Sequence, residues 1–125
     1  MASLSAWVLL GSALGGLARY WLAILVGWLL GPSFPWGTLL INVLGSIVIG
    51  AAGAATDARE HAAFRAFVMV GICGGFTTFS SFSLQTFELL QTGRVGAALG
   101  YAGLSFALCL LAVWAGWMLG NSEWG

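Results

Sequence analysis

The sequence GGFTTFSSFS at residues 74–83 decides how the rest of the chain is interpreted. It combines five hydroxyl side chains and two adjacent glycines with three phenylalanines spaced every third residue, within an apolar segment. In lipid, irregular backbone survives only where protein or a water-filled cavity satisfies its polar groups. The stretch therefore predicts a broken transmembrane helix at an ion site.

The composition of the chain indicates an all-α integral membrane protein. Of its 125 residues, 60% are hydrophobic and only 6% are charged, which is too apolar for a soluble domain of this size. A hydrocarbon core about 30 Å thick needs ~20 helical residues per span, so four spans would use nearly the whole chain. We therefore expect a single four-helix membrane domain over residues 1–125.

The apolar segments set the expected spans at residues 4–30, 36–56, 63–91 and 95–119. The first segment carries no Lys or Arg ahead of its apolar run and is too long for a signal peptide, so we expect it to be retained. Its Gly11, Gly15 and Gly16 make one flank small enough for close helix contact. The third segment is longer than one straight crossing requires, and glycines interrupt it before the hydroxyl-rich stretch.

Several classes of function are disfavoured by the residue types present. The four acidic and four basic residues cancel and form no basic run, which argues against nucleic-acid binding. The single histidine, His61, lies in a polar loop and has no nucleophile to activate, so we expect no enzymatic activity. Cys73 and Cys109 lie in apolar segments and indicate neither a disulfide nor a zinc site.

The basic residues hardly select an orientation in the membrane. With four spans, Arg59 and Arg65 lie on the side of the termini, and Arg94 lies on the opposite side. Two interpretations follow from this weak bias. Either the termini have a modest preference for the cytoplasm, or copies insert both ways and pair antiparallel.

Neutral polar groups in the spans are suited to an anion. The Asn42 amide offers two donors without charge, although membrane asparagines commonly serve helix packing, where such a bond contributes ~1 kcal/mol or less. Phe79 and Phe82 lie on neighbouring turns of one face, and aromatic ring edges are electropositive. Tyr101 and Ser105 form a polar stripe on the fourth span. For all of these residues, packing alone is the competing interpretation.

A break near Gly74 also has an electrostatic consequence. The half-helix that ends there presents unsatisfied carbonyls suited to a cation, whereas the half that begins near Phe79 presents N–H groups. Arg19 lies about 15 residues, roughly 22 Å, into the first span, nearer the far interface than the midplane. We expect a structural role for it, either snorkelling or bracing the break.

Three motifs resemble those of a known family. GGLARY at 15–20, GTLLINVLGS at 37–46 and GGFTTFSSFS at 74–83 are similar, in order and spacing, to the signatures of the Fluc (CrcB-like) fluoride channels. The resemblance covers essentially the whole chain. It implies a small four-helix subunit of a microbial cytoplasmic membrane, assembled as an antiparallel dual-topology homodimer with two fluoride pores and a central sodium ion.

The resemblance also implies roles for individual residues. Asn42, Phe79 and Phe82 match the fluoride ligands of the pore, and Gly74 and Thr77 match the backbone-carbonyl ligands of sodium, two from each subunit. Arg19 resembles the family's first-helix arginine. The rest of the fluoride pathway is assigned by motif to Thr38, Ser80, Ser81, Tyr101 and Ser105.

Two positions depart from the family pattern. Ser81 stands where many relatives have threonine, which keeps the hydroxyl. Cys109 stands where a serine would extend the polar track, and a thiol is a weak donor. The role of that end of the track is therefore left open by the sequence.

The expected function is a fluoride-selective channel that lets fluoride leave the cytoplasm passively and so protects the cell from its toxicity. A small dual-topology proton-coupled exporter is one alternative, but such a protein needs a titratable relay at membrane depth, and we identify no such acid in the spans. A non-transporting membrane assembly subunit, whose glycines and aromatic residues serve packing only, is the other.

Overall fold

The computed structural model describes the backbone of residues 1–124 and the side chains of residues 1–121. The elements are α1 (Ala2–Leu30), α2 (Trp36–Ala55), α3 (Ala62–Arg65), the π-helix η1 (Ala66–Cys73), α4 (Gly74–Phe76), α5 (Phe79–Gln91) and α6 (Val95–Trp124). Within the described range, four helical stretches are long and apolar enough to cross a membrane, namely Ala2–Leu30, Trp36–Ala55, Ala62–Gln91 and Val95–Asn121. This confirms the predicted all-α class with four apolar helices.

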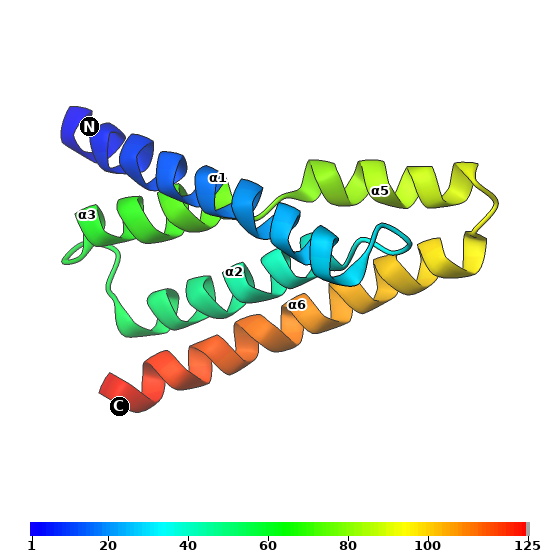
Figure 1. The fold of residues 1–125 in the computed structure, drawn as a ribbon. Coiled ribbons are helices and arrows are strands. Elements are labelled where there is room, and N and C mark those ends of the chain that lie inside the picture. The colour runs from blue at the N-terminus through cyan, green and yellow to red at the C-terminus, as the bar shows by residue number, and fades with distance from the viewer. Residues whose placement is uncertain (125) are drawn as a thin grey trace.

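The helices form an elongated bundle in which α1 crosses the α3–η1 segment, and α2 and α6 run side by side (Figure 1). Both termini lie at the same end as the loop between α2 and α3. The short turns between α1 and α2 and between α5 and α6 lie at the opposite end (Figure 1). The chain therefore alternates in direction from one long stretch to the next, as consecutive membrane spans must.

Glycines bring α1 into backbone contact with η1 and α4. A Cβ on Gly11 would overlap the Phe67 carbonyl and lie 2.8 Å from Gly71 Cα. A Cβ on Gly75 would lie 2.7 Å from the Ser12 carbonyl oxygen, and Gly15 is equally crowded. The prediction of a close-contact flank on the first span is therefore confirmed for Gly11 and Gly15, both of which are buried. Small residues at a helix interface allow this approach in membranes.

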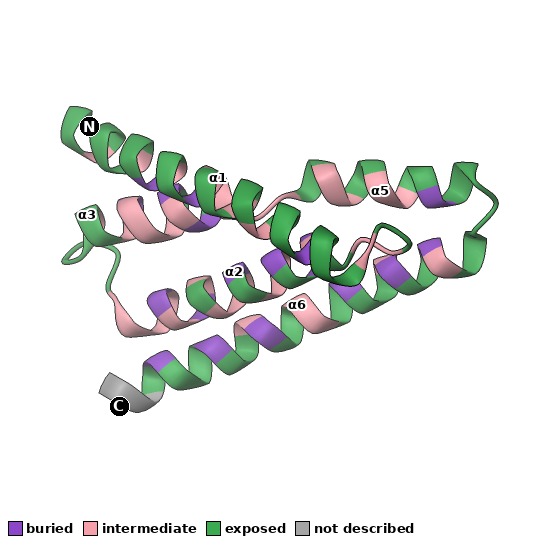
Figure 2. Ribbon diagram, in the orientation of Figure 1, coloured by how far each residue is buried: buried purple, intermediate pink, exposed green. Residues whose placement is uncertain are grey.

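A second close contact joins α2 and α6. A Cβ on Gly50 would overlap the Val113 carbonyl, and one on Gly116 would overlap the Ile47 carbonyl. Nearer the turns, Leu39 and Tyr101 belong to the buried core cluster, with Tyr101 fully buried. Figure 2 shows buried positions along α2 and α6 and at the crossing of α1. The contact of α1 with η1 and α4 and the contact of α2 with α6 together hold the bundle.

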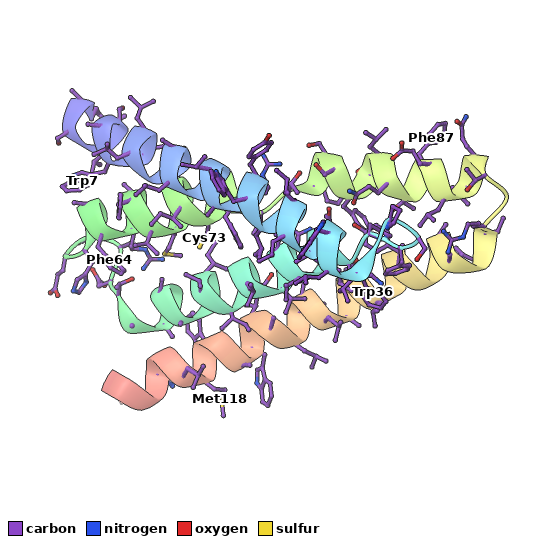
Figure 3. The ribbon with its side chains drawn as sticks, viewed as in Figure 1. Trp7, Trp36, Phe64, Cys73, Phe87 and Met118 are labelled. Carbon is purple, nitrogen blue, oxygen red and sulfur yellow. The ribbon has the colours of Figure 1, made fainter. Side chains whose placement is uncertain are left out.

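The α5 helix is largely exposed. It packs on α6 and α2, and Leu89 is its buried residue. Phe87 points away from the bundle, as Figure 3 shows, and 54% of its surface is exposed. Large exposed apolar surfaces of this kind mark contact with lipid or with another protein.

Asp57 stabilises the loop between α2 and α3 through hydrogen bonds to the backbone. The Asp57 carboxylate accepts the backbone N–H groups of Arg59 at 2.8 Å and Glu60 at 3.2 Å, and these bonds lower its pKa below 3.8. Because folding lowers the pKa of Asp57, any stabilisation from its carboxylate is fully present above pH 3.8. It is lost as the pH falls through the lower pKa of the folded state. The Asp57 amide in turn donates to His61 Nδ1 at 3.0 Å.

The backbone contact at Gly11 generates the first prediction. Gly11→Val would force α1 away from η1, and overpacking costs about 1–3 kcal/mol. We expect the midpoint of thermal unfolding in detergent to fall by at least ~5 °C. Gly27→Ala is the matched control, because Gly27 is exposed on the same helix and a Cβ there meets nothing within 4 Å. Equal midpoints for wild type and Gly11→Val would contradict the packing described.

Candidate functional site

The backbone leaves the helical conformation at two residues within the third apolar stretch. Thr77 has φ −81° and ψ 158°, and Thr78 has φ −151° and ψ 115°, so both are extended between α4 and α5. Threonine suits this position because its branched side chain is compatible with extended backbone. Thr78 then caps α5, since its Oγ1 accepts the Ser81 amide at 3.1 Å. The sequence therefore stops one helix and starts another within two residues.

Asn42 of α2 completes the interruption by pairing with the main chain of Thr78. Its Oδ1 accepts the Thr78 N–H at 2.8 Å, and its Nδ2 donates to the Thr78 carbonyl at 3.2 Å. A side-chain amide has the donor and acceptor of a peptide group, so one residue satisfies both polar groups of the extended position. An amide nitrogen carries two hydrogens, which leaves a second donor on Asn42 for a ligand.

The Asn42 pairing and the Thr78 cap together divert two amides from the carbonyls they would meet in a continuous helix. In an α-helix the Thr78 amide would donate to Gly74, and the Ser81 amide would donate to Thr77. Here the first donates to Asn42 and the second to Thr78 Oγ1. The carbonyls of Gly74 and Thr77 therefore lose these amide donors. They are the two carbonyls that the motif resemblance assigns to a cation.

Arg19 of α1 reaches the same break from the other side. Its Nε donates to the Gly75 carbonyl at 3.3 Å, and the contact is partly buried. The sequence left two structural roles for Arg19, snorkelling to the interface or bracing the break. The contact with the Gly75 carbonyl is the one expected of a bracing residue. A guanidinium is always charged, so it also adds a fixed positive charge beside the interruption.

A cavity of about 420 Å³, which we call the central hollow, lies beside the break. Its lining includes both extended threonines, Gly74, and side chains from α2, α5 and α6: Asn42, Phe79, Phe82, Ser105 and Cys109. The Ser105 hydroxyl is buried and has no hydrogen-bond partner among the described residues. A buried polar atom without a partner is rare and calls for a ligand or water to satisfy it.

The aromatic rings connect the central hollow to the core. Phe79 and Phe82 have ring centroids 5.6 Å apart, and Phe82 lies 5.1 Å from the ring of Tyr101. Phe79 is 79% exposed, whereas Phe82 is half-buried. Phe82 therefore stands between the hollow and the buried tyrosine, while Phe79 faces outward from this single chain.

The remaining predicted residues divide into two groups. Thr38 and Tyr101 are buried near the turn end of the bundle, and Thr38 lines a second cavity there, described below. Ser80 and Ser81 do not line the central hollow. Ser80 is exposed with its Oγ 3.4 Å from that of Thr78, and Ser81 contributes its backbone amide to the cap.

Two residues of the site were not predicted. Thr78 is the partner of Asn42, and its capping role could have been found because a threonine three residues before Ser81 matches a helix N-cap. Gln85 accepts the Tyr101 hydroxyl on its Oε1 at 3.0 Å. A glutamine one turn after Phe82 is a weak signal, since its partner lies 16 residues further along the chain.

Comparisons with known proteins agree over most of the chain. Residues 6–117 match the model of the family described as CrcB-like protein, Camphor Resistance (CrcB). The chain is 53% identical over 114 residues to a protein of Methylocella silvestris, covering 88% of this chain and 87% of the relative. It is 54% identical over 116 residues to one of Paramagnetospirillum magneticum, covering 89% and 90%. Both relatives are named fluoride-specific ion channel FluC.

The paired hydrogen bonds of Asn42 generate the second prediction. Asn42→Leu keeps the branched shape and the number of heavy atoms but removes both bonds to Thr78, each worth about 1 kcal/mol net. We expect amide hydrogen exchange in residues 77–82 to accelerate at least tenfold in lipid nanodiscs, as measured by mass spectrometry. Ser46→Ala is the control, because Ser46 lines the same hollow one turn later on α2. Unchanged exchange in the Asn42 variant would show that the pairing does not hold the break.

Proposed function

The chain belongs to the family of CrcB-like proteins, and from this premise we propose that it is a fluoride-specific ion channel. It lets fluoride leave the cytoplasm passively, down its electrochemical gradient, and so protects the cell from fluoride. The names of the relatives, at about half identity over most of the chain, support this function over a proton-coupled exporter or an assembly subunit.

The observation that carries the proposal is the buried, unpartnered hydroxyl of Ser105, a residue that lines the central hollow. A small anion is strongly hydrated, and a pore must replace its water without binding it too tightly to leave. The Ser105 hydroxyl and the remaining Asn42 N–H are neutral donors of this kind. The electropositive edge of Phe82 adds a third weak interaction. Several weak donors in series favour passage over tight binding.

The pathway extends from the hollow along the polar residues of α2 and α6. Phe82 contacts Tyr101, whose hydroxyl and that of Thr38 continue towards the turns. At the other end, Cys109 offers a weaker donor than a serine would. Ser80 and Ser81, assigned to the pathway by motif, serve it through the partner subunit or not at all, because neither lines the hollow of one chain.

A sodium ion fits the diverted carbonyls at the break. Sodium is a hard cation that prefers oxygen ligands, and the Gly74 and Thr77 carbonyls have lost the amides that a continuous helix would give them. We assign these two carbonyls from each subunit to the ion. Bound there, sodium would neutralise carbonyl dipoles and hold two breaks together.

The assembly that follows is an antiparallel, dual-topology homodimer in the cytoplasmic membrane of a bacterium. Three features support it: the weak Lys/Arg bias, the outward exposure of Phe79 beside the hollow, and the small number of diverted carbonyls, two, that one chain offers a cation. In this assembly the interruption at Thr77 and Thr78 is a true break at membrane depth. The partner then covers the open side of the hollow.

The third prediction tests the pore directly. Purified protein in liposomes should release fluoride, read with a fluoride electrode, at a rate unaffected by an imposed proton gradient. Phe82→Ile removes the ring edge from the hollow and should reduce the flux at least tenfold while leaving assembly intact. Phe87→Ile, on the outward side of the same helix, should leave the flux unchanged.

The outcomes of the liposome experiment separate the channel itself from the role of Phe82. Folded wild type that releases no more fluoride than empty liposomes would overturn the proposed function. Release that follows the proton gradient would favour the exporter instead. Full flux in the Phe82 variant would remove the ring edge from the pathway without overturning the channel.

A further inference from the structure

A second cavity of about 470 Å³, which we call the turn-side hollow, lies where the turn between α1 and α2 meets the end of α5. Polar side chains make up much of its wall: Ser33, Thr38, Gln85, Glu88, Thr92 and Arg94. It opens at the end of the bundle that holds the two short turns. That end is the one at which a membrane span meets water.

Tyr101 separates this hollow from the central one. Its ring lies 5.1 Å from Phe82, which lines the central hollow, and 5.4 Å from Phe34, which lines the turn-side hollow. Its hydroxyl donates to Gln85, another lining residue of the turn-side hollow. The side chain is fully buried. One buried residue therefore lies between the two cavities, and its contacts reach lining residues of both.

Two charges of opposite sign border the turn-side hollow. Glu88 and Arg94 are its charged lining residues, whereas the described lining of the central hollow is neutral. Arg94 is held in place because its Nη1 donates to the Ser33 carbonyl across the two turns. Glu88 lies one turn after Gln85 on α5 and is exposed. Both charges therefore border the turn-side hollow and not the central one.

We propose that the turn-side hollow is the aqueous mouth of the fluoride pathway, and that Arg94 raises and Glu88 lowers the local fluoride concentration there. The inference rests on the proposed function. An exposed unit charge about 10 Å from an ion in water changes the local ion concentration about twofold at low salt. Salt of 1 M, with a screening length of about 3 Å, removes the effect.

Unitary fluoride currents in planar bilayers of uncharged lipid test the proposal. At ~10 mM ionic strength we expect Arg94→Gln to lower the current about twofold and Glu88→Gln to raise it about twofold. Arg94→Lys keeps the charge without the guanidinium and should retain most of the wild-type current. At ~1 M of an impermeant salt, all three variants should approach wild type.

The controls separate the charge from the fold and from the channel itself. Arg59→Gln removes an equal charge from a residue that lines neither hollow and should change the current less than Arg94→Gln. A decrease for both Arg94→Gln and Glu88→Gln that persists at high salt would indicate a structural role and overturn the proposal. Currents equal to that of wild type in both Arg94→Gln and Glu88→Gln at low salt would also overturn the proposal. Absence of current in folded wild type would overturn the proposed function instead.

Discussion

The site depends on a pairing between one side chain and the main-chain N–H and carbonyl of one residue. Asn42 satisfies both the N–H and the carbonyl of Thr78. An unsatisfied backbone group in the hydrocarbon region costs several kcal/mol, so without this partner two extended residues would not persist within an apolar helix. The pairing therefore permits the break, and the break sets the direction of α5 and the position of its phenylalanines.

The same break suits two ions of opposite charge. Extension of Thr77 and Thr78 diverts amides from the carbonyls at the end of α4, which favours a cation there. It also begins α5 beside the central hollow, where ring edges and neutral donors favour an anion. Arg19 contacts the Gly75 carbonyl between these features and balances part of its negative potential. In the proposed channel, the structural role of the carbonyls and the conducting role of the phenylalanines would be separated by about one helical turn.

The sequence was sufficient to predict features that depend on local pattern. Four apolar stretches predicted four helices, and the glycines of the first span predicted a close helix contact, which the structure places against η1. The bidentate pairing of Asn42 was not predictable, because its partner lies 36 residues away and a membrane asparagine can bind many groups. Ser80 and Ser81 share a motif with Phe79 and Phe82 but do not line the hollow of one chain, because a helix turns about 100° per residue. Proximity in sequence did not give proximity in the hollow.

In the proposed channel, a row of neutral donors beside the break conducts fluoride selectively and passively. The most direct measurement is the reversal potential of the current with fluoride on one side of a planar bilayer and chloride on the other. The account predicts a reversal potential that follows the fluoride gradient when fluoride concentration is changed, and that does not move when chloride concentration or pH is changed. A reversal potential that shifts equally with chloride, or one that follows the proton gradient, would contradict it.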